Sequence, residues 1–374
     1  MKPKHKETIV MKVAHMGKAA LHRNCGKGCL ALVFCLFSLW VPTQAQEVAS
    51  NPAGFFRITL LGNSDTIVSL PYLRPAAASG LVASVSGNVL TVSGSTSWTA
   101  SQFVYQPGVQ ANTYFMTVLS GAKEGFYYPI VQSTSDALTL NLADDTLDGM
   151  LPGDRIAVHP YWTLGTIFPK GRAVHASSSQ LIRKTEILIP NYQGTGINLS
   201  AIKTYYFLND DSGGTWRQFA HSGIKDDDVI LPDVMFIVRH NIDTDTTLTV
   251  QGDVASSKWA IPLSTLLAGK QDNIVALPRP IDVSLNNSGL IESGAFASSP
   301  SRLVRTDELL VFNNTLKQKN KSAAATYYYC NGMWQRFPLT DDVGDEKPFK
   351  AGTGIIIRKA SGPTIQLWIN EPGY

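Results

Sequence analysis

Histidines are the first side chains in this 374-residue chain that could do chemistry. Four of them follow residue 45, namely His159, His175, His221 and His240. None shows the H-x-H or H-E-x-x-H spacing that brings two imidazoles to one metal ion. The spacing therefore predicts no metal pair, and we interpret the four as ordinary core and surface residues.

A serine–lysine pair is the next candidate. Ser200 and Lys203 match a Ser-x-x-Lys pattern, in which the lysine could activate the serine as a nucleophile. The equivalent positions later in the chain are Ser322 and Ala325, so the lysine is absent there. We interpret Ser200 as a loop hydroxyl, and the sequence predicts no catalytic residue.

Aspartates cluster between predicted strands and make weak candidates for calcium, a hard cation that takes six to eight oxygen ligands. Their spacing is not that of an EF-hand, and Asp is also a common turn residue. A structural calcium ion is the one cofactor left open. A pair of carboxylates acting as a hydrolase also stays open, although no two stand out. The calcium candidates are Asp226, Asp227, Asp228, Asp341 and Asp342.

Aromatic residues recur at matched positions and are the predicted binding residues, Tyr206, Trp216, Tyr328 and Trp334. Because side chains alternate along a strand, Tyr206 and Tyr328 could face away from the core and stack on sugars. The alternative is that they cover a sheet or join two parts of the protein.

An internal repeat connects these positions. Residues 183–209 align without a gap to residues 305–331, with identity at 11 of 27 positions, which indicates two copies of one structural unit. An upstream match pairs Asp65 with Asp272, so the first copy contains an extra segment. Residues kept in both copies are interpreted as scaffold.

The strand pattern predicts an all-β fold with two related sandwich- or barrel-like units in tandem and a small antiparallel module inserted in the first. Short strands rich in β-branched and aromatic residues alternate with Gly and Asp turns, and an aromatic strand leads through such a turn to each Trp of the pair. A short helix is possible only at Ser264–Gly269. The predicted parts are a signal peptide at 1–45, a first unit at 46–81 plus 167–260, an inserted module at 82–166 and a second unit at 261–374.

The N-terminus has the composition of a secretory signal. Residues 1–28 contain seven Lys or Arg and one acid, and an apolar run at 29–41 leads to Thr-Gln-Ala at 43–45. That run is short for a membrane span, which needs roughly 20 residues. We expect cleavage after Ala45, leaving no transmembrane anchor and placing the protein in the periplasm, at the outer cell surface or outside the cell.

Charge and cysteine content narrow the function classes. Residues 1–45 hold 7 of the 32 basic and 1 of the 29 acidic residues, so the remainder carries 25 and 28. This balance lacks the clustered basic charge of a nucleic-acid-binding protein. Cys330 is the single cysteine after the leader, so no internal disulfide is expected, and Leu208 at the matched position predicts that it is buried.

Several phrases stand out along the chain: PYWTLGTIFP, RKTEILIP followed by GINLS, TYYFLN, DNIVALPRP and NNSGLIESGAF. Together they resemble a family of exported bacterial β-rich proteins with no assigned activity. The resemblance covers about residues 55–374, and it implies export without supplying catalytic residues. The segment PYWTLGTIFP lies where the insert rejoins the first copy, and we expect it to pack against both the insert and the first copy.

The sequence thus favours a non-enzymatic exported protein with a structural or interaction role at the cell envelope or beyond it. Its expected partners are an envelope polysaccharide or another surface protein. A carbohydrate- or polymer-binding protein that uses the exposed aromatics is the alternative, and a carboxylate-dependent hydrolase is a further one.

Overall fold

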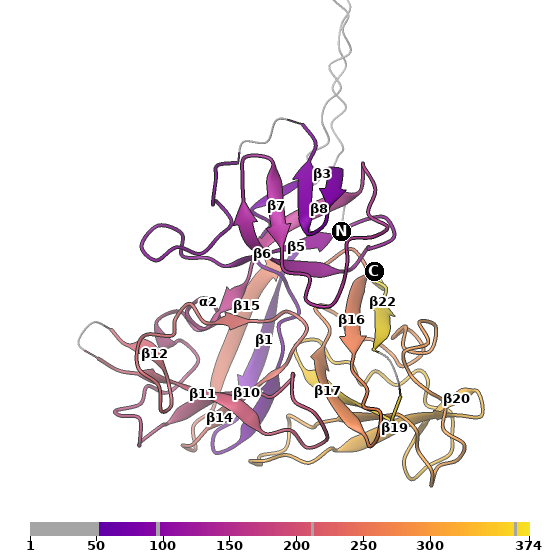
Figure 1. The fold of residues 1–374 in the computed structure, drawn as a ribbon. Coiled ribbons are helices and arrows are strands. Elements are labelled where there is room, and N and C mark those ends of the chain that lie inside the picture. The colour runs from indigo at the N-terminus through magenta and orange to yellow at the C-terminus, as the bar shows by residue number, and fades with distance from the viewer. Residues whose placement is uncertain (1–51, 95–97, 211–212, 363–364) are drawn as a thin grey trace, which may run out of the picture. The chain divides into compact units, whose positions relative to one another are not determined.

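Two five-stranded antiparallel sheets and a closed barrel contain most of the ordered backbone in the computed structural model (Figure 1). The structure describes residues 52–94, 98–210, 213–362 and 365–374, so the predicted signal at 1–45 lies outside the described residues. Nearly every element is a strand, which confirms the all-β prediction. Residues 51–374 group into one compact unit.

The first sheet has the strand order β12-β11-β10-β14-β2. Its inner face packs under a two-stranded ribbon, β1-β15, so the two layers enclose a core that includes Leu60, Ile187 and Trp216. We call these seven strands the first unit. They are β1 (Ala53–Leu60), β2 (Asp65–Val68), β10 (Thr185–Pro190), β11 (Ala201–Leu208), β12 (Thr215–Gln218), β14 (Phe236–His240) and β15 (Thr246–Asp253).

The second sheet has the order β20-β19-β18-β21-β17 and matches the first strand for strand. The ribbon β16-β22 covers its inner face, and Trp259, Trp334 and Trp368 lie in the core between them. We call these strands the second unit: β16 (Trp259–Leu263), β17 (Gln271–Ala276), β18 (Glu308–Val311), β19 (Ala325–Cys330), β20 (Met333–Arg336), β21 (Gly354–Lys359) and β22 (Gln366–Asn370). The matching order supports the duplication, which stays a prediction.

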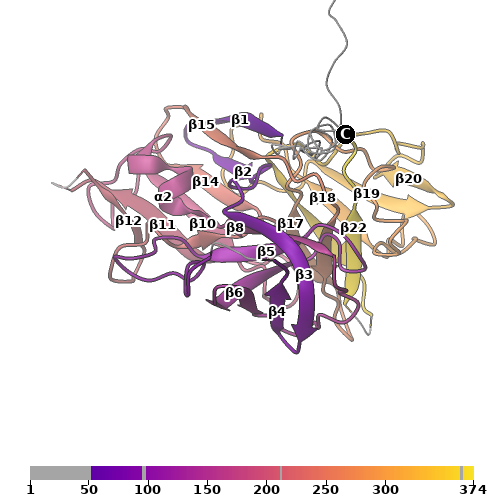
Figure 2. The same ribbon diagram turned by 90° about the horizontal axis from the view of Figure 1, so that it is seen from above.

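A closed antiparallel barrel with the order β3-β4-β7-β6-β5-β8 spans 78–160 and overlaps the predicted insert at 82–166 (Figure 2). Leu90, Phe103 and Met116 lie in its buried interior. The strands are β3 (Ala78–Ser86), β4 (Val89–Val92), β5 (Tyr114–Val118), β6 (Tyr127–Ser133), β7 (Ala137–Leu140) and β8 (Arg155–Pro160).

The segment after the barrel packs against the barrel and the first unit, as expected for PYWTLGTIFP, and it also contacts the second unit. Tyr161 packs with Phe115 of the barrel and with the core of the second unit. Leu164 and Phe168 pack into the core of the first unit. The elements here are β9 (Trp162–Thr163), its partner β13 (Val229–Ile230), the short helix α2 (Leu164–Ile167) with a Thr163 capping box, and the 3₁₀ turn η1 (Pro169–Gly171).

Two sequence expectations need correction. Residues 264–269 form bends and coil, because this stretch leads from β16 to β17 and lacks an apolar helical face. The predicted boundary at 260/261 falls inside β16, which begins at Trp259 and whose side chains point alternately into the core of the second unit.

Cys330 is buried as predicted, with 2% of its surface exposed.

The two units place different polar pairs at one matched buried position. In the first unit Thr185 Oγ1 lies 2.8 Å from His240 Nδ1, which makes a neutral pair. At the matched positions of the second unit, Lys359 forms an ion pair with Asp307, and both side chains are almost completely buried. The carboxylate of Asp307 also accepts backbone hydrogen bonds from Ala297 and Ala360, so the charges are held on several sides.

Removing the cation alone should therefore destabilise the second unit. Lys359→Met leaves a buried carboxylate without its partner, and we expect the free energy of unfolding in urea to fall by roughly 3–5 kcal/mol. The double variant Asp307→Thr/Lys359→His reproduces the pair of the first unit and should be more stable than Lys359→Met. Equal stability of the parent and Lys359→Met would show that the ion pair contributes nothing.

Candidate functional site

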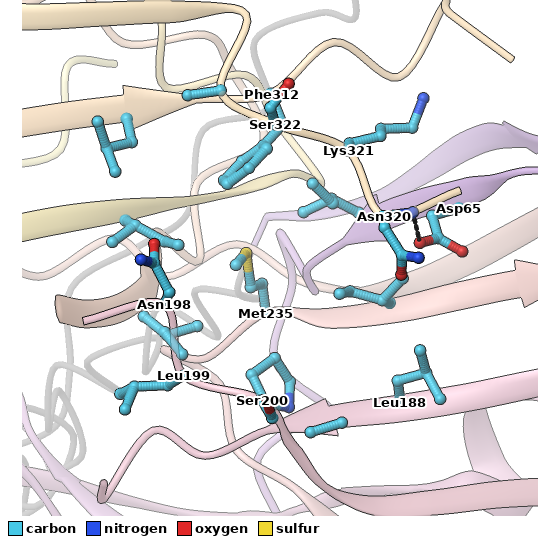
Figure 3. A pocket seen from close by; sticks show the side chains of 18 of the residues that line it. Asp65, Leu188, Asn198, Leu199, Ser200, Met235, Phe312, Asn320, Lys321 and Ser322 are labelled. Atoms are coloured by element: carbon cyan, nitrogen blue, oxygen red, sulfur yellow. Dashed lines mark hydrogen bonds between the residues drawn. The ribbon is translucent and has the colours of Figure 1, made fainter. Parts of the chain in front are cut away.

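A cavity of about 970 Å³ lies between the two sheets, on the faces that point away from their cores (Figure 3). Strand alternation creates it: Ile187 enters the first core, while its neighbours Glu186 and Leu188 line the cavity. Phe312, Lys321 and Ser322 of the second unit lie opposite Leu188, Leu199 and Ser200 of the first. Ligand sites usually measure about 300–1,000 Å³.

Each sheet contributes one apolar row to the cavity, set by strand register. In the first sheet Ile67 pairs with Ile237, Ile237 with Leu188, and Leu188 with Thr204. All four side chains line the cavity. The row in the second sheet contains the matched residues, Ile274, Ile356, Leu310 and Thr326.

The two rows meet in a small apolar cluster that lines the cavity. Ile67, Ile274 and Met235 are buried there. Met235 packs against Gly354, where an added Cβ would lie only 2.2 Å from the Met235 Cβ. Glycine at 354 therefore leaves room for the Met235 side chain and allows the sheets to approach there.

The carboxylates that line the cavity are already paired with cations. Arg239 donates to both oxygens of Asp65 at 2.7 and 2.8 Å, and this bonding raises the pKa of the Arg239 guanidinium. Arg183 binds Glu186 at 2.6 Å. Burial alone would raise the pKa of the Glu308 carboxyl, but Lys270 and Arg305 donate to it and lower that pKa.

Two loops cross between the units and form the side walls. Asn320 lies beside Asp65 and Arg239, donating its backbone N–H to Asp65 at 2.7 Å and accepting from Arg239 at 2.6 Å. Asn198 makes the same two contacts with Asp272 and Arg358, at 2.7 and 3.1 Å. Both asparagines have positive φ, a conformation that Asn tolerates better than most residues.

Neutral polar groups remain available inside the cavity. Four hydroxyl groups, on Ser200, Ser322, Thr204 and Thr326, line it and have no hydrogen bond to another described residue. They occur as two matched pairs, one member from each unit. The cavity can thus bind aliphatic groups along its rows and offer hydroxyl hydrogen bonds, without supplying an unpaired carboxylate.

The predicted exposed aromatic surface is absent at the four binding candidates. Tyr206 and Tyr328 are 5% and 0% exposed, and Trp216 and Trp334 are each 1% exposed. Trp216 packs between Phe168 and Phe207 in the first core. Tyr206 and Tyr328 do point away from the cores, but other side chains cover them. None of the four lines the cavity.

The calcium candidates hold loops and neighbouring strands. Asp226 accepts from the Trp216 backbone at 2.7 Å, Asp227 from the Tyr105 hydroxyl, and Asp228 from the Tyr205 hydroxyl. Asp342 caps the Gly344 backbone, and Asp341 is exposed. Across the described part of the chain, no three His, Cys, Asp or Glu side chains are placed to hold a metal ion.

The histidines and the Ser–Lys pair are also dispersed. His159 bonds to the Arg74 carbonyl in the barrel junction, while His175 contacts His240 edge to face in the first unit. His221 is exposed. Ser200 lines the inter-sheet cavity and Lys203 a separate small pocket, and no hydrogen bond joins them.

Sequence reasoning missed the cavity residues because it assigned the shared positions to scaffold. A signal was present: Glu186, Asn198, Ser200 and Thr204 are all identical in the second copy, as Glu308, Asn320, Ser322 and Thr326. Polar residues that both copies share and that lie outside an apolar core suggest a surface built from both units. The strand register brings the four matched pairs into one cavity lining.

Comparison with known families, characterised proteins and solved structures gives no significant match for this chain. In the described residues, no helix is both long and apolar enough to cross a membrane.

The buried side chain of His240 predicts a pH dependence of stability. Burial and the neighbouring His175 lower the pKa of His240 from 6.5 to about 4. Because the unfolded chain takes up a proton that the folded chain resists, stability should fall as the pH drops from about 6.5 toward 4. His240→Gln should flatten this part of the curve of unfolding free energy against pH. The exposed His221→Gln serves as the control, and an unchanged slope in His240→Gln would contradict the assignment.

Proposed function

We propose that this chain is a non-enzymatic interaction protein that acts after export and binds its partner in the inter-sheet cavity. The observation that supports this most is the pair of facing apolar rows, each ending in a free threonine hydroxyl. Export is proposed from the basic and apolar pattern of residues 1–45.

The cavity lining favours an extended, uncharged segment with aliphatic groups, such as part of another surface protein. The rows would take aliphatic side chains, and the unbonded hydroxyls would bond to backbone amides. Phe312 is the single aromatic residue among the described cavity residues, so stacking on sugar rings has little support there.

A hydrolase is less well supported by the same lining. A general acid needs a raised pKa near the working pH, whereas the pKa of the Glu308 carboxyl is lowered by its cationic partners. Asp65 and Glu186 are likewise bound to Arg239 and Arg183. The ion pairs of these carboxylates therefore support a structural role, in which they hold the walls of the cavity.

Filling the cavity tests the proposal. The probe is N-phenyl-1-naphthylamine, a neutral apolar dye whose fluorescence rises on binding. Ala201→Trp and Ala323→Trp place an indole at two cavity positions, and we expect each to weaken saturable dye binding at least tenfold, because the indole would cover part of the lining that the dye contacts.

Ala100→Trp adds the same indole at an exposed position in the barrel segment and should leave dye binding unchanged. Dye binding that is equally strong in all three variants, with unchanged circular dichroism, would exclude the cavity as the binding site.

A further inference from the structure

Two loops expose matched pairs of large aliphatic side chains to water. Leu181 and Ile182 in the first unit are 80% and 62% exposed, and Leu303 and Val304 in the second are 77% and 62% exposed. We call residues 179–184 and 301–306 the apolar loops. Single exposed apolar residues are ordinary, but the same adjacent pair exposed in both units needs an explanation.

Local hydrogen bonds hold each apolar loop in the same conformation. The Ser179 hydroxyl accepts from the backbone of Ile182 at 3.2 Å, and the Ser301 hydroxyl accepts from Val304 at the same distance. Arg183 donates to the Gln180 carbonyl, as Arg305 does to the Arg302 carbonyl. The aliphatic pairs are thus presented in an ordered turn.

An arginine anchors each loop to its sheet. The guanidinium of Arg183 lies 4.4 Å from the ring centroid of Phe219, and Arg305 lies 4.4 Å from Phe337. Each arginine also binds a carboxylate at 2.6 Å, Glu186 in the first unit and the matched glutamate in the second. These contacts fix the loop base, so the apolar side chains reach solvent from a rigid support.

Each loop also carries one exposed cation. Lys184 and Arg302 are exposed, and neither forms an ion pair with any described residue. The second cation of each loop, Arg183 or Arg305, is neutralised by its glutamate. Each loop therefore combines two exposed aliphatic side chains with a positive charge that has no acidic partner.

We propose that the two apolar loops dock the protein peripherally on an anionic lipid surface. Aliphatic side chains next to Lys or Arg are typical of segments that lie in the headgroup region, where the chains enter hydrocarbon and the cations meet anionic headgroups. Protein interfaces are enriched in aromatic residues and arginine and depleted in lysine, whereas the exposed pairs of these loops are aliphatic and one of the two exposed cations is Lys184. Two loops that engage the same surface together add their weak affinities, as stable anchoring by small apolar groups requires.

The proposal is independent of the cavity and is tested on the full chain with vesicles of phosphatidylcholine and phosphatidylglycerol. Hydroxyl-radical footprinting should show at least threefold protection of Leu181, Ile182, Leu303 and Val304 when vesicles are added. Leu151 and Leu267 are 64% and 87% exposed outside the loops and should show no protection. Absence of protection in the loops would overturn the proposal.

Variants separate lipid binding from other causes of protection. Leu181→Ser/Ile182→Ser/Leu303→Ser/Val304→Ser should lower vesicle partitioning at least tenfold below the parent chain, whereas Leu151→Ser/Leu267→Ser should match the parent. Lys184→Gln/Arg302→Gln should weaken binding several-fold on the anionic vesicles and make it less sensitive to salt. Equal partitioning of the fourfold serine variant and the parent, or protection that follows self-association without vesicles, would refute lipid docking.

Discussion

Two buried aspartates, Asp65 and Asp272, each bind an arginine of their own sheet and a loop of the opposite unit. Asp65 is the first residue of the edge strand β2 and Asp272 the second residue of the edge strand β17, and the outer backbone groups of these strands would otherwise be unpaired. The Asp65 N–H donates to the Gln318 carbonyl at 3.0 Å, and the Asp272 N–H donates to Gly196 at 2.9 Å. Each unit thereby completes the edge of the other, which brings the two outer faces together and encloses the cavity.

The two units have different residues at matched positions where packing does not allow the same residue in both. Met235 and Gly354 occupy equivalent positions at the contact between the sheets, and two methionines could not fit there. The buried pair is neutral in the first unit and ionic in the second, so one backbone arrangement accepts either chemistry once the hydrogen bonds are satisfied. The cavity keeps paired polar groups although the surroundings of the two units have diverged.

Local patterns predicted most strands because alternation and turn residues act over short distances. The hairpin β11-β12, with Phe207 opposite Trp216, and the hairpin β19-β20, with Tyr329 opposite Trp334, lie where the aromatic strands and turns indicated. The ribbons β1-β15 and β16-β22 were missed, since each pairs strands that are far apart in the chain. The candidate site was missed for the same reason, because its rows join residues from eight strands.

By itself, the sequence determined the all-β class, the repeated segments, the burial of Cys330 and the positions of the main hairpins. Each of these depends on residue type and on neighbours a few positions away. Only the tertiary structure decided that Tyr206 and Tyr328 are covered, that the acidic loops hold no metal cluster within the described residues, and that Ser200 and Ser322 share a cavity. These outcomes depend on how two sheets face each other, which follows from long-range contacts such as those of Asp65 and Asp272.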